Sequence, residues 1–374
     1  MKEGRSLQDL AKELERQAKE KRDFKSPTRL ITLERLRFEP EEGTESRDFR
    51  LKLGGNGLDM MHLPQNGFKL NSLAHTQLRT WAKIPAKYYD LMWEKDPALL
   101  TTNVNKWLHR ADETRLIRTL DNHARAFLSN RYRCIDNFDV AQTVLPILLE
   151  DPQLKIISCE VTENRLYFKA VTEKLTFEVD VGDVVQAGIV ISNSEVGLGS
   201  VAVEPLLYRL VCKNGAIISD RAMRKYHVGR HHQNLDELTE LFRDETRKAN
   251  DQAFLMKLQD ITRAAFDQVQ FDQVKNIAID AHTRKIEAGP NQVLDRVTET
   301  FGLKKDETEG VLQALISGSG RDQTQWGLAN AVTSVANTTE DYERATELEK
   351  IGGRILTLSA SKWKALADAD VDAA

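Results

Sequence analysis

A series of short apolar, β-branched segments between residues 154 and 191 constrains the fold more than any other feature of this chain. LKIISCEV (154–161) and RLYFKAV (165–171) are separated only by Thr162-Glu163-Asn164, a polar turn typical of an antiparallel hairpin. A third strand, TFEVDV (176–181), and the apolar run Gly188–Ile191 continue the pattern. Strands with such short connections pair with their sequence neighbours, so this stretch predicts an antiparallel β-meander.

The residues after this run predict a glycine-rich turn, a short strand at the alternating Val201 and Val203, and then a helix. Gly197 and Gly199 indicate the turn, because glycine adopts backbone angles that other residues resist. Pro205 suits a first helical turn, where its missing N–H is no loss. The apolar residues after Pro205 fall on one helical face: Leu206, Leu207, Leu210 and Val211. Asn214 and Gly215 predict the end of this helix.

Helices are also predicted on both sides of the meander. Residues 5–22 read as a charged helix capped by Ser6, an arm that docks on a neighbouring subunit or on the body of the protein. Small strands are expected between Thr28 and Leu63. Further helices are expected at 71–81, 85–93, 98–108 and 139–149, and after Asn234 at 235–270, 273–287, 291–301, 306–317, 322–336 and 340–357.

These patterns predict an α+β fold, in which an antiparallel β-meander is packed by helices and followed by a helical C-terminal domain. The predicted divisions are an N-terminal helical arm (1–26), an α+β core with a nucleic-acid groove (27–233), a helical domain (234–358) and an acidic tail (359–374), whose last residues, ALADADVDAA (365–374), are expected to be disordered.

Arginine is concentrated in the segment from Arg115 to Arg133, where Asp121-Asn122-His123 predicts the turn of a hairpin. Arginine offers forked donors to phosphate oxygens and tyrosine offers a stacking face. The segment therefore predicts a nucleic-acid contact by Arg118, Arg125, Arg131, Tyr132 and Arg133. A solvated polar strand face is the alternative, and it stays open. Tyr88, Tyr89 and Trp93 are likewise either base-stacking aromatics or part of the core.

A second basic run, RAMRKYHVGRHH (221–232), follows the meander. Read as a phosphate-binding patch, it contributes Arg221, Arg224, Lys225, His227 and Arg230, together with Lys213 just before it. Read as a metal site, His227 and His231 are spaced i, i+4, with His232 or Asp220 as a third ligand. A glycine between the two histidines weakens a helix there, so no metal site is predicted, and a plain solvated loop is the remaining alternative.

Composition limits the classes of function. The chain of 374 residues has a net charge of −4, so any nucleic-acid binding must rest on a local basic patch. Its three cysteines are widely spaced, as in a reducing cytoplasm, and no apolar run is long enough for a membrane span. We find no phosphate-binding glycine loop and no nucleophile motif, and therefore predict neither an enzyme nor a cofactor.

Several segments together resemble a known family. They are IPAKYYDLM (84–92), FLSNRYRCIDNFDV (127–140), NSEVG (193–197), RLVCKNG (209–215), QWGLANAVTSVAN (325–337) and LEKIGGRIL (348–356). In this order they resemble the phage and plasmid proteins grouped as domain of unknown function 932, over residues 70–356. That resemblance implies a protein of mobile genomes in a bacterial cytoplasm, but no activity.

The order helix, β-meander, helix is in turn similar to the core of phage annealing recombinases of the RecT and Redβ kind. This likeness implies a single-stranded DNA partner, strand annealing without hydrolysis, and a homo-oligomeric ring or filament. Fold likeness is a weak warrant for function. The alternative is a structural or host-interaction assembly protein that binds no nucleic acid.

Overall fold

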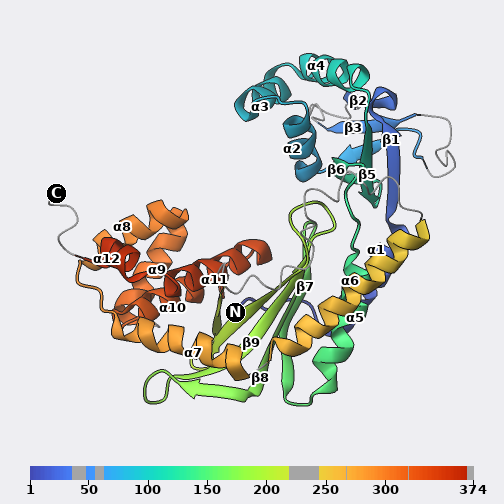
Figure 1. Cartoon of the computed structure of the whole chain (residues 1–374). Helices are drawn as coiled ribbons and strands as arrows, with labels where there is room; N and C mark the ends of the chain where they lie inside the picture. The colour runs from blue at the N-terminus through green and yellow to red at the C-terminus, as the bar shows by residue number, and fades with distance from the viewer. Residues whose placement is uncertain (36–47, 55–62, 219–243, 267, 319, 369–374) are drawn as a thin grey trace.

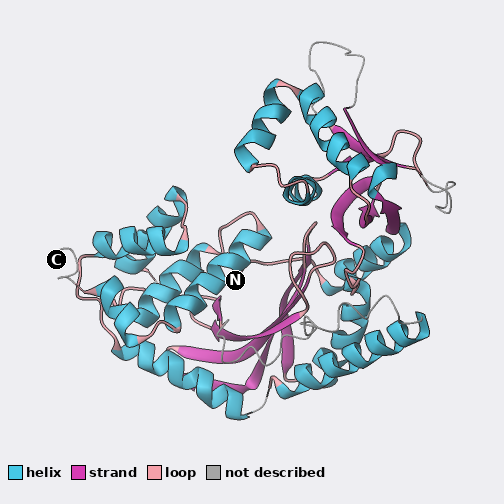
Figure 2. Cartoon of the chain, turned by 45° about the horizontal axis from the view of Figure 1, so that its top comes forward, coloured by secondary structure: helices cyan, strands magenta, loops and turns pink. Residues whose placement is uncertain are grey.

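Two β-sheets, each covered by its own helices, form the body of the chain (Figure 1). The structure is a computed structural model, and it describes residues 1–35, 48–54, 63–218, 244–266, 268–318 and 320–368. In Figures 1 and 2 the first sheet lies at one end of the molecule, the C-terminal helices lie at the other, and the second sheet stands between them. The predicted α+β class is confirmed.

The first sheet, sheet A, comes from the N-terminal third of the chain. Its spatial order is β1-β5-β6-β4-β3-β2, antiparallel except for the pair β4 and β6. Its strands are β1 (Arg22–Pro27), β2 (Ile31–Arg35), β3 (Phe49–Leu53), β4 (Phe68–Leu70), β5 (Thr114–Leu120) and β6 (His123–Ser129). Helices α2 (Ser72–Trp81), α3 (Ala86–Lys95) and α4 (Pro97–Arg110) close one core with these strands, so this unit has its own apolar interior.

The second sheet, sheet B, is the predicted meander, with strands in the order β11-β10-β9-β8-β7 and every pair antiparallel. Its strands are β7 (Leu154–Val161), β8 (Leu166–Glu178), β9 (Val184–Asn193), β10 (Ala202–Arg209) and β11 (Asn214–Ile217). Side chains alternate between its faces. Phe168 and Ala170 pack toward α1, α5 and α6, whereas Tyr167 and Lys169 point to the opposite face, where α11 lies.

Three helices cover one face of sheet B: α1 (Leu7–Glu20), α5 (Asn137–Glu150) and α6 (Asp244–Ala264). Ser6 caps α1 as predicted, since its hydroxyl accepts a hydrogen bond from the backbone N–H of Asp9 at 3.1 Å. Leu10 and Leu14 are buried against α5 and the sheet, so the predicted arm docks on the body of its own chain.

The C-terminal helices share a core with sheet B. They are α7 (Gln268–Thr283), α8 (Pro290–Phe301), α9 (Lys305–Ser317), α10 (Gln325–Val335), α11 (Tyr342–Leu356) and α12 (Ala360–Ala367). One apolar cluster joins Phe177 and Leu207 of the sheet to Trp326 and Ile355 of these helices, so the predicted boundary at residue 233 does not separate two cores. The expected disorder is wrong at residues 365–367, which end α12 and include the buried Leu366.

Two other expectations are corrected in sheet B. The predicted helix after Pro205 is wrong, because residues 202–209 form β10 between β9 and β11. Leu206 and Leu207 face opposite sides of this strand, and a strand buried on both faces needs no alternation of apolar and polar residues. The predicted third strand, 176–181, is no separate strand: its first half, 176–178, is the end of β8, which bulges between Val171 and Thr176, and residues 179–181 form a turn.

A fully buried ion pair joins sheet B to α11. Lys169 Nζ of β8 lies 2.5 Å from Glu349 Oε2 of α11, and neither side chain is exposed. Burial lowers the pKa of Lys169, and Glu349 opposes that shift.

Within the described residues, none of the helices is both long and apolar enough to cross a bilayer.

Gly353 lets α11 approach β11 closely, and this contact generates a stability prediction. A Cβ at Gly353 would lie 1.8 Å from the backbone oxygen of Ile217, and backbone cannot yield as a flexible side chain can. We expect Gly353→Ala to lower the free energy of unfolding by about 1–3 kcal/mol, despite alanine's better helix propensity. Urea unfolding followed by circular dichroism measures this change.

The matched control is Gly310→Ala in α9, where the new Cβ would meet only the side chain of Val335, at 3.1 Å. That side chain can move, so the control is expected to be neutral or stabilising by up to about 1 kcal/mol. Equal effects at the two positions would contradict the close-approach account.

Candidate nucleic-acid interface

The predicted arginine hairpin exists, but two of its arginines point into the protein. β5 and β6 form the hairpin, and Asp121 and Asn122 make its turn with positive φ angles of 50° and 60°. Arg118 is 1% exposed and Arg125 is 5% exposed. Side chains so deeply buried cannot contact a nucleic acid, so the prediction is wrong for these two residues.

Carboxylates explain the burial of Arg118. Its Nε donates to Asp23 Oδ1 at 2.9 Å and its Nη2 to Asp136 Oδ1 at 2.7 Å, while its Nη1 donates to the backbone oxygen of Glu195 at 2.9 Å. Arg125 Nη2 donates to Glu195 Oε2 at 2.7 Å. We call Asp23, Arg118, Arg125, Asp136 and Glu195 the joint cluster, because it ties sheet A to the loop after β9 and to the start of α5.

The other three predicted residues of this segment, Arg131, Tyr132 and Arg133, differ in their surroundings. Tyr132 donates its hydroxyl to the backbone oxygen of Ser194 at 3.0 Å, and burial raises its pKa to about 12. Arg133 Nε donates to Asp251 of α6 at 2.6 Å. Arg131 is exposed, so a nucleic-acid contact there stays a prediction. The hairpin as a whole does not form one basic surface.

Lys213 and the second basic run are the remaining predicted site residues. Lys213 is exposed in the turn between β10 and β11, with a positive φ of 50°, and its proposed role stays a prediction. The other members lie outside the described residues: Asp220, Arg221, Arg224, Lys225, His227, Arg230, His231 and His232. No group of metal-ligating side chains occurs elsewhere, as far as the described ranges extend.

A groove that the sequence did not predict lies between α4 and the connection from α2 to α3. Its volume is about 540 Å³, within the usual range for small-ligand sites. Aromatic and basic side chains dominate its lining, which includes Trp81, Lys83, Tyr88, Asn103, Trp107, Arg110 and Glu113. We call this surface the aromatic groove.

The helical period of α4 places Trp107 in the aromatic groove. Leu100, Val104 and Leu108 recur every four residues and are fully buried against sheet A. Asn103 and Trp107 precede this stripe by one position, so they lie beside it on the helix surface, and the indole of Trp107 is 49% exposed. Tyr88 of α3 is 44% exposed, whereas its neighbour Tyr89 is buried with Trp93 around His75. Two large aromatic faces are thus open to a ligand.

Trp81 forms a fixed wall of the aromatic groove. Its indole Nε1 donates to Glu113 Oε1 at 2.5 Å, and its ring meets Phe127 edge to face with centroids 5.5 Å apart. Arg115 lies over the other ring of this pair, 4.9 Å from the centroid of Phe127. The orientation of Trp81 is therefore set before any ligand binds.

The cations of the aromatic groove are not neutralised by the protein. Lys83 and Arg110 are exposed, and no carboxylate of the described residues lies within ion-pair distance of either side chain. Lys83 also adopts a φ of +56°, a left-handed conformation that residues other than glycine rarely occupy. Residues 71–110 contain six Lys and Arg but three Asp and Glu, so this part of an acidic chain is locally basic.

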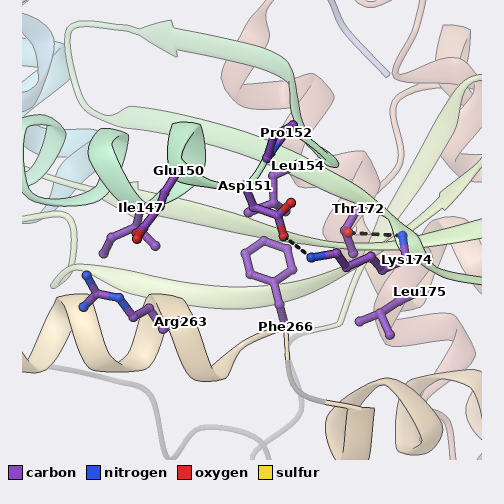
Figure 3. Close-up of a pocket in the computed structure, with 10 residues that line it drawn as sticks. All are labelled: Ile147, Glu150, Asp151, Pro152, Leu154, Thr172, Lys174, Leu175, Arg263 and Phe266. Carbon is purple, nitrogen blue, oxygen red and sulfur yellow. Dashed lines mark hydrogen bonds and ion pairs between the residues drawn. The ribbon is translucent and has the colours of Figure 1, made fainter.

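Two other pockets carry opposite charges close together. In the pocket of about 490 Å³ shown in Figure 3, Lys174 Nζ pairs with Asp151 Oδ2 at 2.5 Å, and Glu150 lines the same pocket as Arg263. A larger pocket, of about 920 Å³ beside α9 and α11, has an acidic excess: its charged residues are Lys304, Asp306, Glu307, Glu340, Asp341 and Arg344. Acidic side chains match or outnumber the basic ones in both pockets, which disfavours a polyanion there.

The sequence contained a signal for the aromatic groove. The buried stripe of α4 is readable from Leu100, Val104 and Leu108, and Trp107 falls outside it. A large aromatic residue that lies outside the buried apolar stripe of its helix is expected either to be exposed to solvent or to contact a ligand. The packing of Trp81 against Glu113, 32 residues away, had no such local signal.

Comparison with known proteins gives a family but no activity. A family model described as Domain of unknown function (DUF932) matches residues 125–351, more than half of the chain. No curated protein and no solved structure matches it. The matched residues include sheet B and most of the C-terminal helices, whereas the aromatic groove precedes them.

The joint cluster predicts that Arg118 is a structural residue. Arg118→Met removes a buried guanidinium and leaves the partly exposed carboxylates of Asp23 and Asp136 without this partner, so we expect the free energy of unfolding to fall by about 1–3 kcal/mol. The same substitution at the exposed Arg131 is expected to change it by no more than about 0.5 kcal/mol. Chemical denaturation of both variants checks this; a stable Arg118→Met protein would contradict the assignment.

The same cluster predicts a dependence of stability on pH. Burial raises the pKa of Asp136, but the charges of Arg118 and Lys21 outweigh burial and lower it overall. A carboxyl whose pKa is lower when folded stabilises the fold above the ordinary aspartate pKa of about 4, and this contribution is lost as the pH falls. Wild type should therefore lose stability more steeply than Asp136→Asn between about pH 5 and pH 2. Parallel urea titrations measure both slopes, and equal slopes would refute the prediction.

Proposed function

The chain belongs to the family described as Domain of unknown function (DUF932), and because that description names no activity, we propose a function from geometry: the protein binds single-stranded nucleic acid in the aromatic groove. The observation that carries the proposal is that two exposed aromatic side chains, Tyr88 and Trp107, line the groove together with Lys83 and Arg110, two cations that form no ion pair with the described residues. Unpaired bases stack on aromatic rings, and cations hold the phosphates between them.

The groove favours single strands over duplexes. Stacking on Trp107 or Tyr88 requires an unpaired base with an accessible face, which a duplex hides. Six basic against three acidic residues in 71–110 also make a modest patch, enough for a few phosphates but not for the long footprint of a duplex-wrapping protein. Binding of this kind is sequence-tolerant and sensitive to salt.

Strand annealing by a homo-oligomeric ring or filament is the finer form of the proposal. Its support is the order α5, five-stranded antiparallel sheet and C-terminal helices, which is similar to the order expected for RecT- and Redβ-like annealing proteins. Such a protein needs no hydrolytic site. In this form of the proposal, the protein is encoded by a phage or plasmid and acts in the cytoplasm of a bacterial host.

A second candidate function is assembly with another protein, without nucleic acid. It is favoured by Leu91 and Leu99, which are 52% and 42% exposed on the same helices, α3 and α4. Mass measurement in solution with and without an oligonucleotide separates the two, since a pure assembly protein is unaffected by the oligonucleotide.

Fluorescence anisotropy with a labelled mixed-sequence single strand tests the proposed function. We expect Trp107→Ala to weaken binding about tenfold, the effect of one lost stacking contact. Lys83→Ala with Arg110→Ala should reduce the slope of log affinity against log salt by about 1.4, which corresponds to two phosphates. An unlabelled duplex of the same sequence should compete poorly.

The matched control removes the same charges from another surface. Lys257→Ala with Arg263→Ala on α6 also deletes one lysine and one arginine, both exposed, and should leave the affinity unchanged. A further variant, Arg224→Ala with Arg230→Ala, tests the basic run outside the described residues. Binding that depends on this run but not on the groove would place the site elsewhere, and no binding at low salt would end the proposal.

A further inference from the structure

Glu113 is the one anion among the residues that line the described part of the aromatic groove. Its Oε1 accepts the hydrogen bond of Trp81, and its Oε2 lies 3.6 Å from Arg115 Nη1. The side chain is nevertheless 46% exposed. A carboxylate has about four lone-pair sites, so these two contacts leave acceptor capacity at the groove surface.

A carboxylate in this place disfavours a phosphate group but can accept a hydrogen bond from the edge of a base. It repels phosphate oxygens, and it accepts hydrogen bonds only from donors. Among the pyrimidines, cytosine presents an amino donor at C4, whereas thymine presents a carbonyl oxygen at the same position. Adenine and guanine also carry amino groups. At the C4 position of a pyrimidine, Glu113 therefore favours an amino group over a carbonyl oxygen.

We infer that the aromatic groove reads the edge of a stacked base through Glu113, and that it prefers strands whose bases carry an exocyclic amino group, cytosine above thymine. The inference rests on the proposed nucleic-acid site and adds a base preference to it. The hydrogen bond with Trp81 holds the carboxylate beside the aromatic wall, and the cations at Lys83 and Arg110 remain available to the flanking phosphates.

Oligocytidine and oligothymidine deoxynucleotides of the same length, about 16 nucleotides, test the inference by anisotropy at neutral pH. These two strands have the same backbone, and their bases differ in the C4 substituent, in the proton at N3 and in the C5 methyl group of thymine. Wild type should bind the cytidine strand about tenfold more tightly, the usual effect of one base-edge contact.

Glu113→Gln is the diagnostic variant. The glutamine oxygen can still accept from Trp81, while its amide can donate to the thymine carbonyl, so the preference should fall to near unity. Tryptophan fluorescence reports whether Trp81 keeps its surroundings in the variant. Asp112→Asn, which removes the neighbouring exposed carboxylate outside the groove lining, is the control and should keep the preference.

The outcomes separate this inference from the proposed function. Equal affinity of wild type for the two strands, or a preference that survives Glu113→Gln, overturns the base-edge inference and leaves single-strand binding intact. Failure of both strands to bind at low salt overturns the proposed function itself. A preference that is lost in Glu113→Gln and kept in Asp112→Asn supports the inference.

Discussion

The buried carboxylate of Glu195 is the contact on which the arrangement of the two sheets depends. Its Oε2 accepts from Arg125 of sheet A and its Oε1 from the backbone N–H of Asn137, both at 2.7 Å. Its own backbone oxygen accepts from Arg118. Glu195, in the loop after β9, therefore contacts both sheet A and the start of α5. Because charges at such a site are shielded from water, each is tolerated only while its partners are in place.

Three of the segments that carry the family resemblance make structural contacts of this kind. In NSEVG, Asn193 Nδ2 donates to Asn137 Oδ1 at 2.8 Å. In RLVCKNG, Asn214 Nδ2 donates to Thr333 Oγ1 of α10 at 2.8 Å. In LEKIGGRIL, Gly353 admits the backbone of β11. These residues specify how the sheets and helices pack together, and these contacts are structural rather than catalytic.

The aromatic groove lies before the matched region, although one resembling segment, IPAKYYDLM (84–92), contributes Ile84, Pro85 and Tyr88 to it. The aromatic groove belongs to the helices over sheet A, in residues that the family model does not match. The matched region provides the second sheet and the helices built on it, while the N-terminal unit supplies exposed aromatics and cations. Such a division lets one scaffold present different binding surfaces, because loops and covering helices change more easily than a buried joint.

Local chemistry made much of the fold predictable. Ser6 and Asn71 cap the helices expected after them, and Asp121 and Asn122 form the expected hairpin turn. These outcomes need only the residues within one turn of the chain. The segment after Pro205 could not be predicted from local residues. A run of leucines is compatible with a helix and with a strand that is buried on both faces, and pairing with β9 and β11 makes it a strand.

By itself, then, the sequence determined the α+β class, most helices and the meander, since caps, turns and apolar periods act over a few residues. Only the tertiary structure decided which arginines meet solvent. Arg118 is separated from Asp23 by 95 residues and from Glu195 by 77. A guanidinium looks the same in the sequence whether it will face phosphate or a buried carboxylate. Its role is set by the charges that folding brings within about 3 Å of it.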